Sequence, residues 1–330
     1  MTEQNYDVCG IGNAIVDVIA KSDDAFLAEH GLNKGAMTLL DLDGATSLYA
    51  KMPSGIESSG GSAGNTMAGV ASFGGKGVYI GKVADDELGE VFIHDIRAVG
   101  VDFHTNPATD SKPTARCLIL VTPDAQRTMN TYLGACVELG PDDVDDNIIR
   151  RSKVTYMEGY LWDPPLAKEA FIKAARIAHE AGQKVALSLS DSFCVGRHRD
   201  SFRDLVDGHI DILFANDAEI KSLYETDDFD AAVRNVREKV EIAALTRGAQ
   251  GSVVVTPEEV ISIEAAPVAQ VVDTTGAGDL YAAGFLYGYT NGYAPAQWGQ
   301  LGSLAAGEVI SHYGARPEVS LAELAQKIAR

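Results

Sequence analysis

Segments with the composition of buried strands alternate along most of this chain with segments that have the periodicity of helices. The alternation runs from residue 6 to residue 99 and resumes at residue 154. Parallel neighbouring strands need a long crossover connection, which a helix usually provides. The order therefore predicts an α/β fold with a mostly parallel sheet and crossover helices. The expected strands of this sheet span residues 6–12, 77–83, 154–158, 184–189, 210–215 and 241–246, and the principal helices span residues 66–73, 85–99, 165–181, 199–206, 231–240, 280–288, 295–313 and 320–329.

A β-rich insertion interrupts this alternation. Strand-like runs at 114–121 and 127–133 are separated by Thr122-Pro123-Asp124-Ala125-Gln126, which is typical of a hairpin loop. With a further short strand at 36–40, they predict a small sheet that stands off the main one. We expect this sheet to be a lid that excludes water from a site. It is inserted from about residues 17–60 and 108–136 into a single domain of residues 1–330.

A turn of small residues precedes the helix expected at 280–288. Gly276-Ala277-Gly278 follows a short apolar run, and Asp279 stands where a helix begins. Glycines allow backbone N–H groups to approach a ligand, and the positive end of the helix faces the same space. The turn therefore predicts a polyanion site. Asp279 has two interpretations: a base that removes a proton from a substrate hydroxyl, or a helix cap.

Polar residues and a second pair of glycines occur near the N-terminal third of the chain. Asn13 and Asp17 bracket the end of the first strand, where open α/β sheets bind ligands, although turn chemistry and a solvated Asp17 would also explain them. Gly60 and Gly61 precede a helix that carries Asn65 on its first turn. This segment is either a close approach of backbone to ligand or a hinge followed by a capped helix.

Composition limits the classes of partner. The formal net charge is −20, from 47 acidic and 27 basic residues, which argues against nucleic acid and anionic membrane as main partners. The cysteines are scattered, the N-terminus has no signal peptide pattern, and no apolar run approaches the ~18 residues of a membrane helix. We expect a soluble, cytoplasmic protein that binds small molecules, as a monomer or homodimer.

Taken in order, these motifs resemble the ribokinase-like (PfkB) family of carbohydrate and nucleoside kinases. The resemblance runs from Gly10 to about Pro317 and rests on four motifs: Gly60-Gly61 with Asn65, Asn216-x-x-Glu219, the Gly248/Gly251 turn and Asp273–Asp279. It implies a three-layer α/β/α core with a β-sheet lid. It also implies ATP-dependent transfer of a phosphoryl group to a hydroxyl, with ATP and Mg²⁺ as cofactors.

The resemblance implies roles on the nucleotide side. Asp279 would be the catalytic base, and the amides of Gly276, Ala277 and Gly278 the anion hole. Asn216 and Glu219 would organise Mg²⁺ through water, unless Glu219 is only a surface helix residue. The nucleotide-binding turn is matched by Thr246, Gly248 and Gly251. Asp273 and Thr275 match positions whose backbone oxygens hold K⁺ in some members of the family.

On the acceptor side, Asp17, Gly60, Gly61 and Asn65 match the contacts to sugar hydroxyls. The Gly12-Asn13-x-x-x-Asp17 pattern is similar to that of bacterial adenosine kinase-like members, so Asn13 joins the substrate-binding residues. Arg127 matches a lid arginine directed at the phosphates, or is a solvated hairpin residue. Met129 would face a purine or pack inside the lid.

Adenosine is the leading acceptor, which would give AMP and ADP. Glu158 departs from the adenosine kinase pattern and resembles an acidic residue of sugar kinases, while Tyr160 and Trp162 would stack on a base or simply pack. The alternatives are therefore a ribose, fructose or 2-keto-3-deoxygluconate kinase and, more distantly, a non-catalytic ligand-sensing protein. The need for K⁺ is open.

Overall fold

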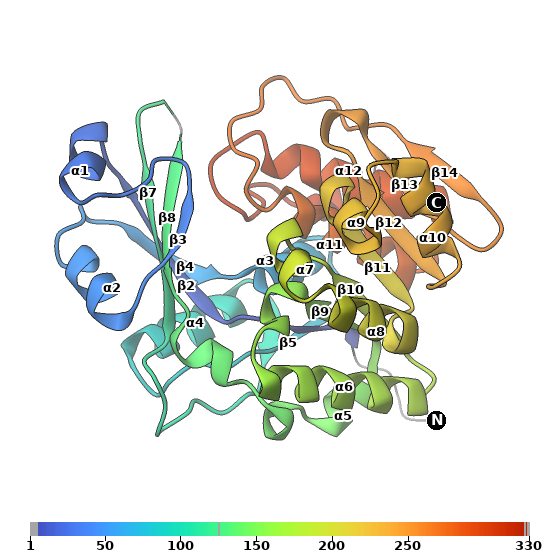
Figure 1. Ribbon diagram of the computed structural model, residues 1–330, viewed down its shortest axis with the longest axis horizontal. Helices are drawn as coiled ribbons and strands as arrows, with labels where there is room; N and C mark the ends of the chain where they lie inside the picture. The colour runs from blue at the N-terminus through green and yellow to red at the C-terminus, as the bar shows by residue number, and fades with distance from the viewer. Residues whose placement is uncertain (1–5, 125, 327, 329–330) are drawn as a thin grey trace.

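A computed structural model describes residues 6–124, 126–326 and 328, and it contains two β-sheets of unequal size (Figure 1). In the described residues the larger sheet has nine strands in the order β14-β13-β12-β11-β10-β9-β1-β5-β6. The strands from β6 to β12 are parallel, and the edge strands β13 and β14 are antiparallel. The expectation of an α/β fold with a mostly parallel sheet is confirmed. Its strands are β1 (Tyr6–Ile11), β5 (Gly77–Ile80), β6 (Val101–Phe103), β9 (Ser152–Glu158), β10 (Lys184–Ser188), β11 (Ile212–Asn216), β12 (Ile242–Thr246), β13 (Ser252–Val255) and β14 (Val260–Ile263).

Helices cover both faces of this sheet, because its central strands are apolar on both sides and would otherwise expose them. Each face has its own buried cluster, one containing Phe171 and Phe202 and the other containing Phe92 and Phe285. The molecule is therefore built in three layers (Figure 1). The helices around the first cluster are α5 (Asp146–Arg150), α6 (Pro165–Glu180), α7 (Ser192–Arg197), α8 (Arg199–His209), α9 (Asp217–Tyr224) and α10 (Phe229–Arg237), and those around the second are α3 (Ser62–Ser72), α4 (Glu87–Ala98), α11 (Ala277–Thr290), α12 (Pro295–Val309) and α13 (Leu321–Ala325).

The smaller sheet has five strands in the described residues, in the order β3-β8-β7-β2-β4, and stands beside the main body at the left of Figure 1. The expected hairpin is confirmed as the antiparallel pair β7 and β8, although residue 125 of its loop lies outside the described residues. Its helices α1 and α2 pack on the outer side (Figure 1). The elements are β2 (Ile15–Lys21), α1 (Asp24–Glu29), β3 (Met37–Leu39), α2 (Leu42–Tyr49), β4 (Ile56–Gly60), β7 (Ala115–Val121) and β8 (Arg127–Tyr132).

Several elements differ from the sequence-based expectations. The helix expected at 295–313 ends at Val309, and a loop that contains Gly314 at a φ of 105° follows it. The helix expected at 320–329 spans Leu321–Ala325, and residues 327, 329 and 330 lie outside the described part of the chain. Strand β4 was not expected, because Ser58, Ser59 and Gly60 have low strand propensity. Helices α5, α7 and α9 were also missed, since each is no longer than eight residues.

Candidate active site

The small-residue turn is held in place by a neighbouring loop. Gly276 is the N-cap of α11 and has a φ of 76°, a conformation that favours glycine. A Cβ on Gly276 would lie 2.8 Å from the Cα of Ala315, so only glycine fits for steric reasons as well. Gly278, by contrast, has no atom within 4 Å of the position of a Cβ. The turn is therefore packed on one side and open on the other. The amide of Ala277 is not fully free, since its N–H lies 3.3 Å from the carbonyl oxygen of Thr274.

Asp279 is held from α3 rather than by its own helix. The hydroxyl of Ser62 donates to Oδ1 at 2.6 Å, and Nδ2 of Asn65 donates to Oδ2 at 3.1 Å. Burial raises the pKa of Asp279 to about 6, and these two hydrogen bonds and the positive charge of Arg316 oppose that rise. The carboxylate is thus ionised in most molecules at neutral pH and close to the range in which a general base works well.

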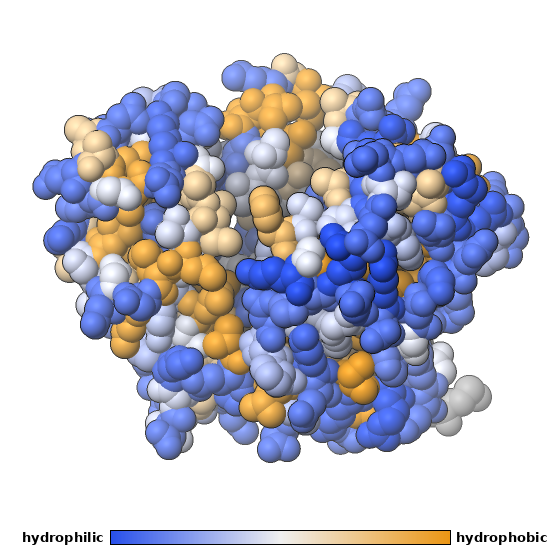
Figure 2. Space-filling model, viewed as in Figure 1, coloured by the Kyte–Doolittle hydropathy of each residue, from blue (hydrophilic) through white to orange (hydrophobic). Residues whose placement is uncertain are grey.

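Two adjoining cavities flank the turn. The first has a volume of about 640 Å³, and its wall includes Asn65, Asp279, Glu219 and the backbone of residues 276–278. The second, of about 490 Å³, is lined mainly by small and apolar side chains such as Ala265, Val268 and Ile310. Both are lined by Thr246, Gly248, Thr274, Ala277, Gly278 and Tyr281. The surface is hollowed between the smaller sheet and the main body (Figure 2).

Asn216 and Glu219 form a reciprocal cap at the start of α9. The amide N–H of Asn216 donates to Glu219 Oε2 at 2.8 Å, its Nδ2 donates to Oε1 at 2.6 Å, and the N–H of Glu219 donates back to Asn216 Oδ1 at 2.9 Å. Glu219 is only 6% exposed, so its interpretation as a surface helix residue is wrong. Burial raises the pKa of Glu219 to about 7, against the hydrogen bond from Asn216 and with the help of the negative charge of Asp191.

The acceptor-side residues converge where β2 meets β4. The carboxylate of Asp17 lies against Gly60, where a Cβ would come within 2.3 Å of Oδ2. Gly61 has a φ of 82°, and a Cβ there would meet the carbonyl oxygen of Asn13 at 2.2 Å. Burial raises the pKa of Asp17 to about 6, while Arg127 and Arg316 lower it and Asp279 raises it further. Asp17 is therefore partly buried beside other charges, and the alternative of a freely solvated carboxylate is wrong.

Arg127 crosses from the smaller sheet to the main body. It is 8% exposed, so the alternative of a solvated hairpin residue is wrong, and its Nη1 pairs with Asp273 Oδ2. The other carboxylate oxygen of Asp273 accepts hydrogen bonds from the N–H of Thr275 at 3.0 Å and its hydroxyl at 2.7 Å. Although burial opposes it, these bonds and the charge of Arg127 hold the pKa of Asp273 below its usual value.

Glu158 is buried beneath the acceptor residues rather than exposed in the cavity. It is 1% exposed and accepts hydrogen bonds from Nδ2 of Asn13 at 2.7 Å and from the amide of Ala63 at 2.9 Å. Burial raises the pKa of Glu158 to about 7. Its contacts position Asn13 and the start of α3. Of the nearby aromatic residues, Tyr160 lines the first cavity, whereas Trp162 is 3% exposed and packs in the core.

Most of the sequence-predicted residues line one cavity system, whereas Asn13, Asp17, Gly60, Arg127 and Asp273 line neither cavity. Asn65, Met129, Asn216, Glu219, Thr246, Thr275, Gly248 and residues 276–279 line the first cavity, and Gly251 lines the second. Arg316 was missed. Its position after Gly314-Ala315 carries no recognised motif that could have indicated its role.

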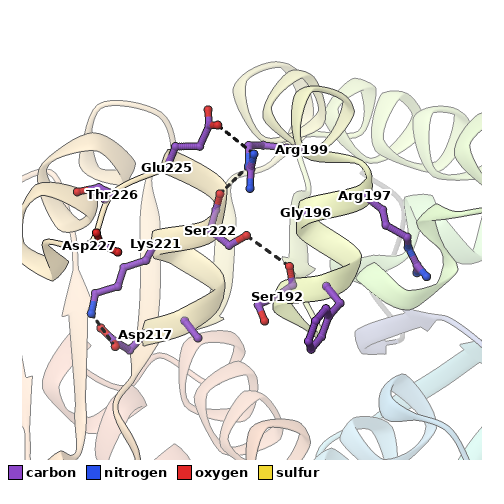
Figure 3. A pocket seen from close by; sticks show the side chains of 12 residues that line it. Ser192, Gly196, Arg197, Arg199, Asp217, Lys221, Ser222, Glu225, Thr226 and Asp227 are labelled. Atoms are coloured by element: carbon purple, nitrogen blue, oxygen red, sulfur yellow. Dashed lines mark hydrogen bonds and ion pairs between the residues drawn. The ribbon is translucent and has the colours of Figure 1, made fainter. Parts of the chain in front are cut away.

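A separate groove lies between α7 and α9 (Figure 3). Its cations are paired: Lys221 lies 2.9 Å from Asp217, Arg199 lies 3.0 Å from Glu225, and Arg197 lies 3.1 Å from Asp163. Because these cations are already neutralised, the groove attracts an anionic ligand less than free cations would.

Among the described residues, no helix is long and apolar enough to cross a membrane. The same residues contain no group of three or more His, Cys, Asp or Glu side chains that could hold a metal ion.

Comparison with known proteins agrees with this geometry. The model of the pfkB family carbohydrate kinases matches residues 35–321. The crystal structure of adenosine kinase from Sinorhizobium meliloti is 57% identical, with a TM-score of 0.90, and the match covers 98% of this chain and 99% of that one. A probable sugar kinase from Rhizobium etli is 52% identical, with a TM-score of 0.91 and 98% of both chains covered. An ATP-dependent ribose-1-phosphate kinase from Halopiger xanaduensis is 32% identical over 251 residues, which are 75% of this chain and 77% of that protein.

Proposed function

The chain belongs to the pfkB family of carbohydrate kinases, phosphotransferases that act on an alcohol group, and we propose that this member phosphorylates adenosine with ATP. The observation that carries the proposal is the position of Asp279. Its carboxylate lies on the wall of the cavity, between the small-residue turn and the polar groups of α3. A base and an anion-binding turn on one cavity wall suit phosphoryl transfer to a hydroxyl.

The chemistry follows from these positions. The acceptor's primary hydroxyl attacks the γ-phosphorus of ATP, the new O–P bond forms and the bond to the β-phosphate oxygen breaks, which releases ADP. Asp279 receives the hydroxyl proton, and the backbone N–H groups of Gly276 and Gly278 stabilise negative charge on the transferring group. The second, more apolar cavity suits the adenine of ATP, because an aromatic base is better accommodated by its alanine, valine and isoleucine side chains.

Glu219 fits a role beside Mg²⁺ that enters with the triphosphate. Its carboxylate already accepts two hydrogen bonds from Asn216, which leaves lone pairs for water molecules of the ion's hydration shell. When bound, Mg²⁺ would neutralise charge on the phosphate oxygens.

An uncharged acceptor is favoured by the cavity walls. The described residues that line the two cavities include no lysine, arginine or histidine, whereas Asp279 contributes negative charge. A sugar acid or sugar phosphate would bring further negative charge to this site. Met129, Tyr160 and Phe214 supply apolar surface that suits a purine. These features support adenosine over ribose 1-phosphate or 2-keto-3-deoxygluconate.

The test is a panel of acceptors assayed with ATP and Mg²⁺, with and without K⁺. Adenosine, ribose, fructose, ribose 1-phosphate and 2-keto-3-deoxygluconate are compared by kcat/KM, and the product is identified by mass spectrometry. We expect adenosine to give the highest value and AMP as the product. A higher kcat/KM for a sugar would overturn the choice of acceptor, and no product from any acceptor would favour a non-catalytic ligand-sensing protein.

A further inference from the structure

The loop between α12 and α13 is held against the small-residue turn by a hydrogen bond and a packing contact. The amide of Gly314 donates to Asp273 Oδ2 at 3.1 Å, and the Cα of Ala315 lies against Gly276. The next residue, Arg316, therefore starts from a fixed point beside the turn. Its side chain is 20% exposed and lies among groups from three other elements.

Arg316 bridges β4 and α3. Its Nη2 donates to the carbonyl oxygen of Ser59 and, at 2.8 Å, to the hydroxyl oxygen of the same residue. Its Nε donates to Asn65 Oδ1 at 3.3 Å. Asp95 of α4 supports this arrangement, because it accepts hydrogen bonds from the backbone and hydroxyl of Ser59 and lies 3.9 Å from Nη1 of Arg316.

The contact with Asn65 determines how that amide faces Asp279. An amide side chain has a carbonyl oxygen that accepts hydrogen bonds on one side and an NH₂ group that donates on the other. Because Arg316 can only donate, it selects the oxygen of Asn65 and leaves Nδ2 to donate to Asp279 Oδ2 at 3.1 Å. Ser59 of the smaller sheet is thereby connected to the carboxylate of Asp279 through Arg316 and Asn65.

The charge of Arg316 acts on the same carboxylate. Asp279 is surrounded by Ser62 and Asn65 of α3, Asp17 of β2, Tyr156 and Glu158 of β9, and Tyr160, in addition to Arg316. Burial favours the protonated form of Asp279. The cation Arg316 opposes this effect, and it lowers the pKa of both Asp17 and Asp279.

We propose that Arg316 is a positioning residue that connects the smaller sheet to the general base by orienting Asn65 toward Asp279. The inference deepens the proposed function and rests on it, because it takes Asp279 to be the base. It requires the acceptor-side strand β4 to be in its place before the base is fully oriented.

The experiment compares Arg316→Gln and Arg316→Lys with the wild-type full-length chain, using the acceptor that the wild type phosphorylates best. The readouts are kcat, the acceptor KM, the pH dependence of kcat and the melting temperature. Arg203→Gln is the matched control. Arg203 also donates to a backbone carbonyl and pairs with a carboxylate, and 33% of its side chain is exposed, but it lines neither cavity.

For Arg316→Gln we expect kcat to fall roughly 10- to 100-fold, because the base is no longer held in line. We expect the acidic limb of its pH profile to move to higher pH by on the order of one unit, because the cation is lost. Arg316→Lys keeps the charge but cannot donate to all three oxygens of Ser59 and Asn65. It should therefore lower kcat while leaving the acidic limb of the pH profile near that of the wild type. Arg203→Gln should change neither readout.

Four outcomes separate the possible failures. An unshifted acidic limb in a folded Arg316→Gln variant would overturn the inference, as would a loss confined to the acceptor KM. Equal limb shifts in Arg316→Gln and Arg316→Lys would overturn the assignment of the shift to charge. A wild-type protein that phosphorylates none of the acceptors would instead overturn the proposed function.

Discussion

Replacing Gly278 by alanine tests whether this glycine is required for stability of the fold or for binding of a ligand. Gly278 is the second residue of α11, its φ is negative, and a Cβ there would meet nothing within 4 Å. The substitution therefore introduces no steric conflict. Alanine has a higher helix propensity, so the free energy of unfolding should rise by roughly 0.5–1 kcal/mol. For a chain of this size, the melting temperature should rise by about 1 °C.

Activity should change in the opposite direction. The methyl group would project into space shared by the two cavities, where the phosphates of ATP approach the backbone in the proposed function. A displacement of the reacting group by ~1 Å costs on the order of 100-fold, so we expect kcat/KM for ATP to fall by about that factor. The variant would be more stable and much less active.

Two other glycines provide matched controls. Gly276→Ala has to adopt a φ of 76° and meets Ala315, so it should lose roughly 1–2 kcal/mol from backbone strain and about 1–3 kcal/mol from overpacking. Gly182→Ala has a similar φ of 72° with no atom within 4 Å, so it should lose only the strain energy and keep full activity.

The assay pairs calorimetric melting with initial rates at varied ATP concentration. If Gly278→Ala retained wild-type kcat/KM, phosphate would not approach this turn closely, and the anion-binding role would be refuted. If it lowered the melting temperature as Gly276→Ala should, the open side of the turn would be packed in solution.

Three further substitutions and one titration test other parts of the site. Asp279→Asn should lower kcat on the order of 10²–10⁴-fold with little change in acceptor binding measured by calorimetry; a loss of affinity alone would contradict the base assignment. In the wild type, kcat should fall about tenfold per pH unit below pH 6, because the pKa of Asp279 is about 6 and only the ionised carboxylate accepts a proton. Direct measurement of the product at each pH checks this, and a flat pH profile down to pH 5 would contradict it. Asp17→Ala should raise the acceptor KM in steady-state kinetics, and an unchanged KM would remove Asp17 from the acceptor site. Arg127→Gln leaves the buried carboxylate of Asp273 without its cation, so urea denaturation should show a loss of roughly 3 kcal/mol, and a loss near zero would mean that the ion pair does not form in solution.

The main sheet was predictable because its strands are buried on both faces and appear as continuous apolar runs between amphipathic helices. Strand β4 has no such pattern, since its register with β2 is determined by pairing and not by apolar residues. Helix α9 was missed because Asn216 and Glu219 were interpreted as ligand groups, although the same two side chains also cap the helix.

The site was predictable where a local motif carried it and not where distant segments meet. The turn at 276–278 and its following carboxylate are adjacent in the chain, so their closeness at one wall of a cavity could be predicted. The pairing of Arg127 with Asp273 joins residues 146 positions apart, and Arg316 reaches Asn65 across 251 positions. Neither contact leaves a periodic or spacing signal in a single sequence.

The short connection from β1 to β2 would act as a hinge for the smaller sheet, and this hinge lies beside the acceptor residues. Only residues 12–14 separate the two strands, and Asp17 is the third residue of β2. Arg127 pairs with Val121, which lies opposite Lys21 at the far end of that strand. At ~3.3 Å per residue, a swing of about 10° would move the far end roughly 4 Å and Asp17 less than half as far. Such a swing would separate Arg127 from Asp273 while leaving Asp17 close to its place.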